Sequence, residues 1–181
     1  MPSVEQCIEL LKERGHSEYG GEAVTQIEHA LQCAMLAEDE GASSPLIVAA
    51  LLHDIGHLLH ALPDDAPEEG IDDNHEELGY RYLRQIYGDA VSEPVRLHVP
   101  AKRYLCATDS QYQSQLSEPS LVSLKLQGGP MTNEEVSSFE DNPHSQEAVR
   151  LRRWDDIGKV PGLKTPPLEY YVSHLQSVYR S

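Results

Sequence analysis

The sequence predicts an all-α protein, and three features support this prediction. Apolar residues recur at intervals of three and four along most of the chain, the spacing that places them on one face of a helix, whereas the alternation typical of strands is scarce. Capping residues precede several of these segments, and glycine or proline follows them. The 181 residues contain no internal repeat and no linker. We therefore expect a single domain over residues 1–181 with eight to ten helices.

The first three expected helices cover residues 4–15, 25–40 and 44–60. The first two each end at or just before a glycine, a common helix stop. Thr25 suits the N-cap of the second helix, because its hydroxyl can accept a hydrogen bond from a free backbone N–H. The third helix, which continues as LIVAALLHDIGHLLH, is strongly apolar and begins with Ser-Pro, which places proline in the tolerated first turn.

The rest of the chain is expected to form an acidic loop followed by further helices. The loop covers residues 61–73 and contains two prolines and a glycine. A short helix should follow Thr132, because TNEE is a capping-box sequence. The other helices are expected at 74–87, 91–107 with an interruption near Pro100, 119–127, 143–159 and 168–179.

Charge and composition restrict the partners and the compartment. The chain has 14 lysines and arginines against 30 aspartates and glutamates, a net charge of −16, which argues against binding to nucleic acid or to anionic membranes. On charge alone, a small anionic substrate is unexpected too. The longest apolar run is far shorter than the roughly 20 residues that span a bilayer, and the N-terminus lacks the order of a signal peptide. Cys7, Cys33 and Cys106 form no CxxC pair, which indicates reduced, buried cysteines in a cytoplasmic protein.

The histidines and aspartates predict a metal site. His53 and Asp54 are adjacent inside the most apolar expected helix, where both are costly to bury unless they are paired or bind metal. Further candidate ligands lie on other expected helices: His29, His75, His98 and Asp155. Imidazole nitrogen and carboxylate oxygen suit iron, manganese, zinc or nickel, and the lack of clustered cysteines argues against a soft-metal site.

These residues are similar to a known signature. His29, His53-Asp54 and Asp155 match the H…HD…D pattern of the HD-domain superfamily, an all-helical fold built around bound metal, whose members are mostly phosphohydrolases. Longer stretches resemble a narrower group, the HD-domain diiron oxygenases related to inositol oxygenase, and among them the organophosphonate oxygenases. The stretches are YGGEAVTQIEHALQ around His29, ALLHDIGHL around His53, NHEELGYRYL around His75 and LRRWDDIGK around Asp155.

The resemblance implies a single HD-domain helical bundle around two iron ions in a mixed-valent Fe(II)/Fe(III) pair. The implied ligands are His29, His53 and Asp155 for one iron, His75 and His98 for the other, and Asp54 as the bridge between them. Asp155 is preferred to Asp156 because the family pattern places the ligand four residues before a lysine, here Lys159.

The resemblance also implies a reaction and a set of substrate contacts. A non-haem diiron dioxygenase would use O₂ to cleave the C–P bond of (R)-2-amino-1-hydroxyethylphosphonate, giving glycine and phosphate. Glu22 would meet the substrate ammonium, and Tyr19 would act as a gate beside Gly20 and Gly21. The implied phosphonate contacts are His57, Lys102, Ser120, Gln127 and Arg152. Tyr19, Glu22, His57 and Lys102 are the implied catalytic residues.

Three alternatives remain open at this point. The same ligands would serve an HD phosphohydrolase acting on a nucleotide or phosphomonoester. A closer alternative is an oxygenase for the N-trimethylated analogue, whose quaternary ammonium favours an aromatic cage. A binding module with a degenerate HD fold would predict missing ligands, yet all six candidates are present. We expect a monomer or a weak oligomer whose partners are a small organophosphonate and O₂.

Overall fold

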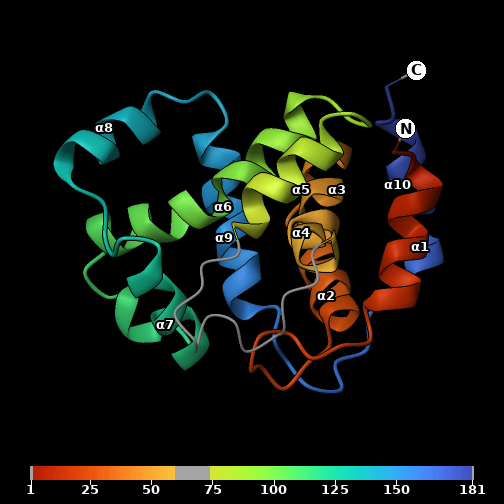
Figure 1. Cartoon of the computed structure of the whole chain (residues 1–181), viewed down its shortest axis with the longest axis horizontal. Coiled ribbons are helices and arrows are strands. Elements are labelled where there is room, and N and C mark those ends of the chain that lie inside the picture. Colours follow the sequence, from red (N-terminus) through yellow and green to blue (C-terminus); the bar gives the residue numbers. More distant parts are fainter. Residues whose placement is uncertain (1, 60–73, 181) are drawn as a thin grey trace.

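The computed structural model describes residues 2–59 and 74–180 (Figure 1). This part of the chain forms ten α-helices and two short 3₁₀ helices, and its β-structure is limited to two isolated bridges. The all-α class is therefore confirmed. The expected acidic loop at residues 61–73 lies outside the described residues. Within the described residues, no helix combines the length and the apolar character needed to cross a membrane.

The helix bounds agree with most of the expected ones. In chain order the α-helices are α1 Val4–Arg14, α2 Gln26–Asp39, α3 Ser44–Leu52, α4 Ile55–Leu59, α5 His75–Leu83, α6 Asp89–Thr108, α7 Glu118–Leu126, α8 Asn133–Glu140, α9 Ser145–Ile157 and α10 Val172–Ser177. The 3₁₀ helices are η1 Gln113–Gln115 and η2 Leu168–Tyr171. Thr25 is the N-cap of α2 and Thr132 the N-cap of α8, as the sequence predicts. Both helices begin with a reciprocal capping box, which was expected only at Thr132.

The central element of the fold is α3, which is buried on all sides. Every residue from Leu46 to Leu52 is buried, and the helix packs against α2, α6, α9 and α10. In Figure 1, α1 and α10 lie at one end of the molecule and α7 and α8 at the other. The main apolar core gathers around α3 and includes Trp154 of α9. This packing brings α2, α3, α6 and α9 together around one interior region.

Two expectations about helix continuity are wrong. The segment expected as one helix over 44–60 is broken by a turn at His53-Asp54, between α3 and α4. The apolar periodicity does not reveal this break, because His53 keeps nearly helical dihedral angles, φ −59° and ψ −34°. Conversely, α6 continues through Pro94 and Pro100. Proline costs about 3 kcal/mol inside a helix, and burial of α6 against α3, α5 and α9 offsets that cost.

Candidate metal centre and substrate cavity

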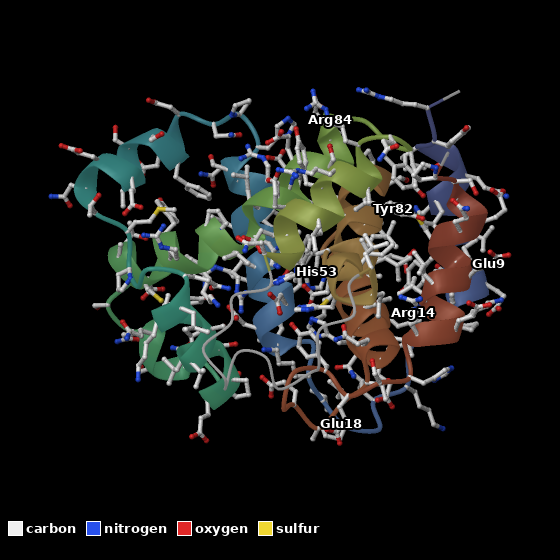
Figure 2. The ribbon with its side chains drawn as sticks, in the orientation of Figure 1. Glu9, Arg14, Glu18, His53, Tyr82 and Arg84 are labelled. Carbon is white, nitrogen blue, oxygen red and sulfur yellow. The ribbon has the colours of Figure 1, made fainter. Side chains whose placement is uncertain are left out.

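The six expected metal ligands converge in the middle of the molecule, where Figure 2 shows His53. They come from five parts of the chain: His29 from α2, His53 and Asp54 from the turn between α3 and α4, His75 from the start of α5, His98 from α6, and Asp155 from α9. All six are buried, with at most 7% of the residue exposed. The fold therefore brings together every ligand that the sequence suggested.

Four of these residues form a first group of possible ligands. Nε2 of His29 lies 3.2 Å from Nε2 of His53 and 3.4 Å from Oδ1 of Asp155. Oδ2 of Asp54 lies 3.6 Å from Nε2 of His29 and 3.2 Å from Nε2 of His53. The ligand atoms of the four residues all lie within 4.8 Å of one another, which is close enough for one ion to contact them all.

Asp54 also belongs to a second group. Its other oxygen, Oδ1, lies 3.3 Å from Nε2 of His75 and 3.4 Å from Nε2 of His98. These two ring nitrogens are 3.2 Å apart. Asp54 therefore turns Oδ2 toward the first group and Oδ1 toward the second, the arrangement that a carboxylate needs to bridge two cations.

The backbone orients the imidazole rings of His29, His53 and His98. In each of these rings, Nδ1 lies within hydrogen-bonding distance of a carbonyl oxygen: His29 with Gly158 at 2.8 Å, His53 with Ala50 at 2.9 Å, and His98 with Val95 at 2.6 Å. Because a carbonyl oxygen only accepts, Nδ1 must carry the proton, and a neutral ring then presents the lone pair of Nε2. Metal-binding histidines are held in this way.

The donor set fits a pair of metal ions. Opposed Nε2 lone pairs and carboxylate oxygens at 3.2–3.6 Å need positive charge between them. Oδ2 of Asp54 is buried and has no hydrogen-bond partner among the described residues, and an orphaned carboxylate oxygen at this position is a natural ligand atom. Burial favours the neutral form of Asp54, but the adjacent His53 keeps the pKa of its carboxyl well below the usual range. Imidazole and carboxylate ligands suit iron or manganese.

Glycine makes the close approach of α4 and α5 possible. A Cβ atom on Gly56 would lie only 1.9 Å from the carbonyl oxygen of His75. Any larger residue at position 56 would therefore push the start of α5 away from the turn that carries Asp54, and with it the second group of ligands.

Cys33 is a poor candidate for a further ligand. Its Sγ lies 3.7 Å from Nε2 of His29 and 3.6 Å from the carbonyl oxygen of Trp154. Burial raises the pKa of the thiol well above its ordinary value, and the thiolate is the form that binds metal. Cys7 and Cys33 are buried as expected, while Cys106 is partly exposed.

Arg152 forms ion pairs with Asp155 of the first group and with the neighbouring Asp156. Its Nη1 lies 2.6 Å from Oδ2 of Asp155, and its Nη2 lies 2.5 Å from Oδ1 of Asp156. The hydroxyl of Tyr112 donates a hydrogen bond to Asp156 as well. Burial opposes ionisation of Asp155, but the Arg152 guanidinium keeps the pKa of the Asp155 carboxyl well below the usual range. Asp155 therefore stays ionised for metal, and Asp156 pairs with Arg152.

A cavity of about 500 Å³ opens beside the ligands. All seven of the expected substrate residues line it: Tyr19, Glu22, His57, Lys102, Ser120, Gln127 and Arg152. Three of the candidate metal ligands line it too, namely His75, His98 and Asp155. The cavity is therefore continuous with the candidate metal centre.

Lys102 is the most deeply buried lysine of the cavity wall. Only 2% of it is exposed, and its Nζ donates a hydrogen bond to Oγ of Ser123 at 2.8 Å. Burial, reinforced by the nearby Arg152 charge, lowers the pKa of Lys102 to about 7. The side-chain oxygen of Gln127 is buried and has no hydrogen-bond partner among the described residues, so this amide has unused capacity for a ligand.

Tyr19 and His57 cover the two ligand groups. The Tyr19 ring stacks on His29 with centroids 4.0 Å apart, and its hydroxyl donates to Oδ1 of Asp155 at 3.3 Å. His57 stacks on His75, also at 4.0 Å. Gly20 and Gly21, which follow Tyr19, have φ angles of 42° and 79°, a left-handed conformation that glycine adopts without strain.

Glu22 already has a cationic partner. Its Oε1 accepts hydrogen bonds from Oγ of Ser117 at 2.5 Å and from Nζ of Lys159 at 3.1 Å. Sequence reasoning used Lys159 only as a marker of the signature and missed it as a cavity residue. The available signal was its place in the family pattern, four residues after Asp155.

Comparisons with known proteins agree with this geometry. The family described as HD domain matches residues 26–153. The chain is 48% identical over 175 residues to a hydroxymethylphosphonate dioxygenase of Gimesia maris, covering 96% of this chain and 87% of that protein. It is 44% identical over 167 residues to the glycine-betaine-forming 1-hydroxy-2-(trimethylamino)ethylphosphonate dioxygenase of Leisingera caerulea, with 92% and 85% covered. An uncharacterized protein of Acanthamoeba polyphaga mimivirus is 37% identical over 171 residues, with 93% and 78% covered.

The fold and the ligand set therefore define an HD-domain protein, and this chain belongs to the HD-domain family. Within that family it belongs with the phosphonate dioxygenases, since two such enzymes match nearly its whole length. It is an oxidoreductase, and its His and Asp clusters form a metal-binding site of the kind that the HD signature predicts.

Proposed function

We propose that this protein uses O₂ and two iron ions to cleave the C–P bond of a 1-hydroxyalkylphosphonate, with (R)-2-amino-1-hydroxyethylphosphonate as the substrate. The reaction balances as one substrate plus one O₂ to one glycine plus one phosphoric acid. C1 is oxidised to a carboxyl carbon while O₂ is reduced. The observation that carries the proposal is the cavity, lined by Lys102 and Arg152, that opens on two ligand groups joined by Asp54.

The proposed iron ligands are those of the two groups. His29, His53 and Asp155 would hold one ion, His75 and His98 the other, with Asp54 between them. When bound as a mixed-valent pair, the irons would supply the redox chemistry and lower the pKa of a coordinated hydroxyl. The protein's part is to hold the imidazole rings by their Nδ1 protons and to keep both carboxylates ionised.

The phosphonate would bind at the cationic side of the cavity. Lys102 offers a buried ammonium, and Arg152 offers a guanidinium that Asp155 and Asp156 hold in place. Ser120 and the unsatisfied amide of Gln127 would supply neutral hydrogen bonds. Charged donors are the strongest partners of a phosphonate oxyanion, so Lys102 and Arg152 would give the phosphonate local partners despite the net charge of −16.

Glu22 and Tyr19 would act at the substrate's other groups. The carboxylate of Glu22 suits a primary ammonium, which donates hydrogen bonds. Tyr19 covers His29 and bonds Asp155 in this structure, so it would move aside when substrate enters, and the Gly20-Gly21 backbone makes that motion possible.

The lining of the cavity favours a primary amine over the trimethylated analogue. An N-trimethyl group cannot donate a hydrogen bond and is typically held by a cage of aromatic rings. Among the described residues that line the cavity, Tyr19 is the sole tyrosine, phenylalanine or tryptophan. One ring beside a carboxylate does not form such a cage.

A second candidate substrate is hydroxymethylphosphonate, which carries no amine. The pairing of Glu22 with Lys159 favours it, because this carboxylate is already neutralised without any ammonium from a substrate. The relative from Gimesia maris bears the name of this activity. With hydroxymethylphosphonate, the same balanced reaction would give formic acid and phosphoric acid.

The decisive experiment compares phosphate release with and without O₂. Iron-loaded protein would be given each of the two phosphonates, with O₂ consumption recorded beside phosphate. We expect about one phosphate per O₂ consumed and no release under anaerobic conditions. Undiminished anaerobic release would identify a phosphohydrolase that uses the same ligands and would refute the oxygenase proposal.

A variant separates the two substrates. Replacing Glu22 by glutamine removes the negative charge but keeps the hydrogen-bonding shape, so the KM for the aminated substrate should rise at least tenfold. Glu134→Gln, on the exposed side of α8, is the matched control. Unchanged kinetics with the aminated substrate would rule out an ammonium contact at Glu22.

A further inference from the structure

Lys159 makes three contacts with residues of the proposed substrate site. Its Nζ donates a hydrogen bond to Oε1 of Glu22 at 3.1 Å and another to Oγ of Ser120 at 3.3 Å. The same ammonium lies 5.5 Å from the centroid of the Tyr19 ring. The Lys159 and Glu22 side chains are only 10% and 15% exposed, so this ion pair lies in the wall of the cavity, largely screened from solvent.

We propose that Lys159 is a specificity-determining residue, which occupies the cation position at Glu22 and so sets the preference between amine-free and aminated 1-hydroxyalkylphosphonates. The inference rests on the proposed function. It adds a residue that the HD signature assigns no role, and it gives the Glu22 carboxylate two competing partners, one from the protein and one from the substrate.

The charges explain how such a pair would act. An unpaired Glu22 would repel a phosphonate, since both are anionic and share one cavity. Lys159 cancels that repulsion, so a substrate without an amine can bind while the pair stays intact. A substrate ammonium must instead share Glu22 with Lys159 and bears the repulsion between the two cations. Lys159 therefore supports binding of the amine-free substrate and reduces, without removing, the advantage that Glu22 gives the aminated one.

The backbone holds Lys159 in a defined place. The residue before it, Gly158, accepts a hydrogen bond from Nδ1 of His29 at 2.8 Å. The residue after it, Val160, exchanges two hydrogen bonds with the side chain of Gln32, at 2.9 and 3.0 Å. Because both neighbours are tied to α2, the backbone of Lys159 is held in place, and the contacts with Glu22 and Ser120 hold its ammonium. A fixed ammonium gives a definite charge at Glu22, as a specificity residue requires.

The test measures affinity for the two substrates as a ratio. Iron-loaded protein under anaerobic conditions would be titrated calorimetrically with hydroxymethylphosphonate and with 2-amino-1-hydroxyethylphosphonate. In Lys159→Met, the ratio of the two dissociation constants should shift by at least about tenfold in favour of the aminated substrate. The reason is that Glu22 no longer accepts a charge-assisted hydrogen bond from Lys159 and can accept one from the substrate ammonium instead. The ratio of kcat/KM in air should shift in the same direction.

Three further variants and the wild type separate the possible results. Lys159→Arg keeps the charge and should keep the wild-type ratio, and Lys164→Met, an exposed lysine five residues on, should change nothing. Lys159→Gln replaces Lys159→Met if the latter does not fold. An equal loss of affinity for both phosphonates would show that Lys159 supports the cavity without selecting between the substrates. That result would overturn this inference but not the proposed function. A wild-type protein that binds neither phosphonate would overturn the proposed function and the inference with it.

Discussion

Replacing Lys102 by methionine should change the pH dependence of stability. Lys102 is 2% exposed, and its pKa falls from an ordinary 10.5 to about 7. Between these two values the unfolded chain carries a proton on Lys102 that the folded protein has lost. The free energy of unfolding therefore rises with pH in this window. Methionine has a stem of similar length and no proton to lose, so the variant lacks this contribution.

The size of the effect follows from linkage. Each pH unit is worth about 1.4 kcal/mol for one proton. From pH 7 to pH 9, allowing for half-titration at pH 7, the Lys102 contribution amounts to about 2 kcal/mol. Titrating groups shared by both proteins cancel in the difference between them. Bound metal ions would repel the ammonium and move the window to lower pH, so the measurement uses metal-free protein.

Urea denaturation followed by circular dichroism at pH 7 and pH 9 would give the free energies of unfolding. Between pH 7 and pH 9, we expect the free energy of unfolding of the wild type to rise by about 2 kcal/mol relative to that of Lys102→Met. Lys125→Met, at an exposed position of α7, is the matched control and should differ from wild type by the same amount at both. A difference between wild type and Lys102→Met that does not vary with pH would refute a lowered pKa at Lys102.

Other predictions test the site and the core. Asp54→Asn should lower the metal content measured by mass spectrometry from about two ions to one or fewer, and a variant that keeps both ions would contradict the bridging role. Asp156→Asn should lower kcat/KM about tenfold with little loss of metal, because Arg152 loses one of its two carboxylates; unchanged kcat/KM would show that Arg152 is positioned without Asp156. The kcat/KM of the iron-loaded wild type should fall as the pH rises through a midpoint below about 7, since the metal ions further lower the pH at which Lys102 loses its charge, and Lys102→Arg should move that decline to higher pH. Leu51→Ala should lower the free energy of unfolding by about 2–5 kcal/mol, since Leu51 is 1% exposed, and a loss below 1 kcal/mol in urea denaturation would show that the core collapses around it.

The ligand set could be predicted from the sequence because its residues are chemically conspicuous there. His53 and Asp54 stand side by side in an apolar segment, and burial of such a pair has few explanations besides metal. Most helix positions could be predicted as well, since Thr25 and Thr132 mark the starts of their helices in the local sequence. Three expectations remain predictions: that residues 1–181 form one domain, that the six clustered residues bind metal, and that the seven cavity residues have the roles given above.

The break between α3 and α4 and the partners of the charged groups could not be predicted. The turn at His53 keeps nearly helical dihedral angles, so the apolar spacing continues across it. The sequence pattern therefore predicts one continuous helix there. Glu22 and Lys159 are 137 residues apart in the chain, and nothing local couples them. Arg152 pairs with both Asp155 and Asp156, the third and fourth residues after it, and only the tertiary packing turns the other oxygen of Asp155 toward His29.

The sequence by itself determined the all-α class, the order of the helices and the six residues able to hold metal, because periodicity, caps and residue chemistry are local properties. Net charge, also a property of the sequence alone, misdescribed the site, since a total of −16 says nothing about where Lys102, Arg152 and Lys159 gather. Only the tertiary structure decided which oxygen of Asp54 faces which group, which pKa values shift and which cation reaches Glu22. Those properties depend on distances of a few ångströms between residues far apart in the chain, and folding alone sets such distances.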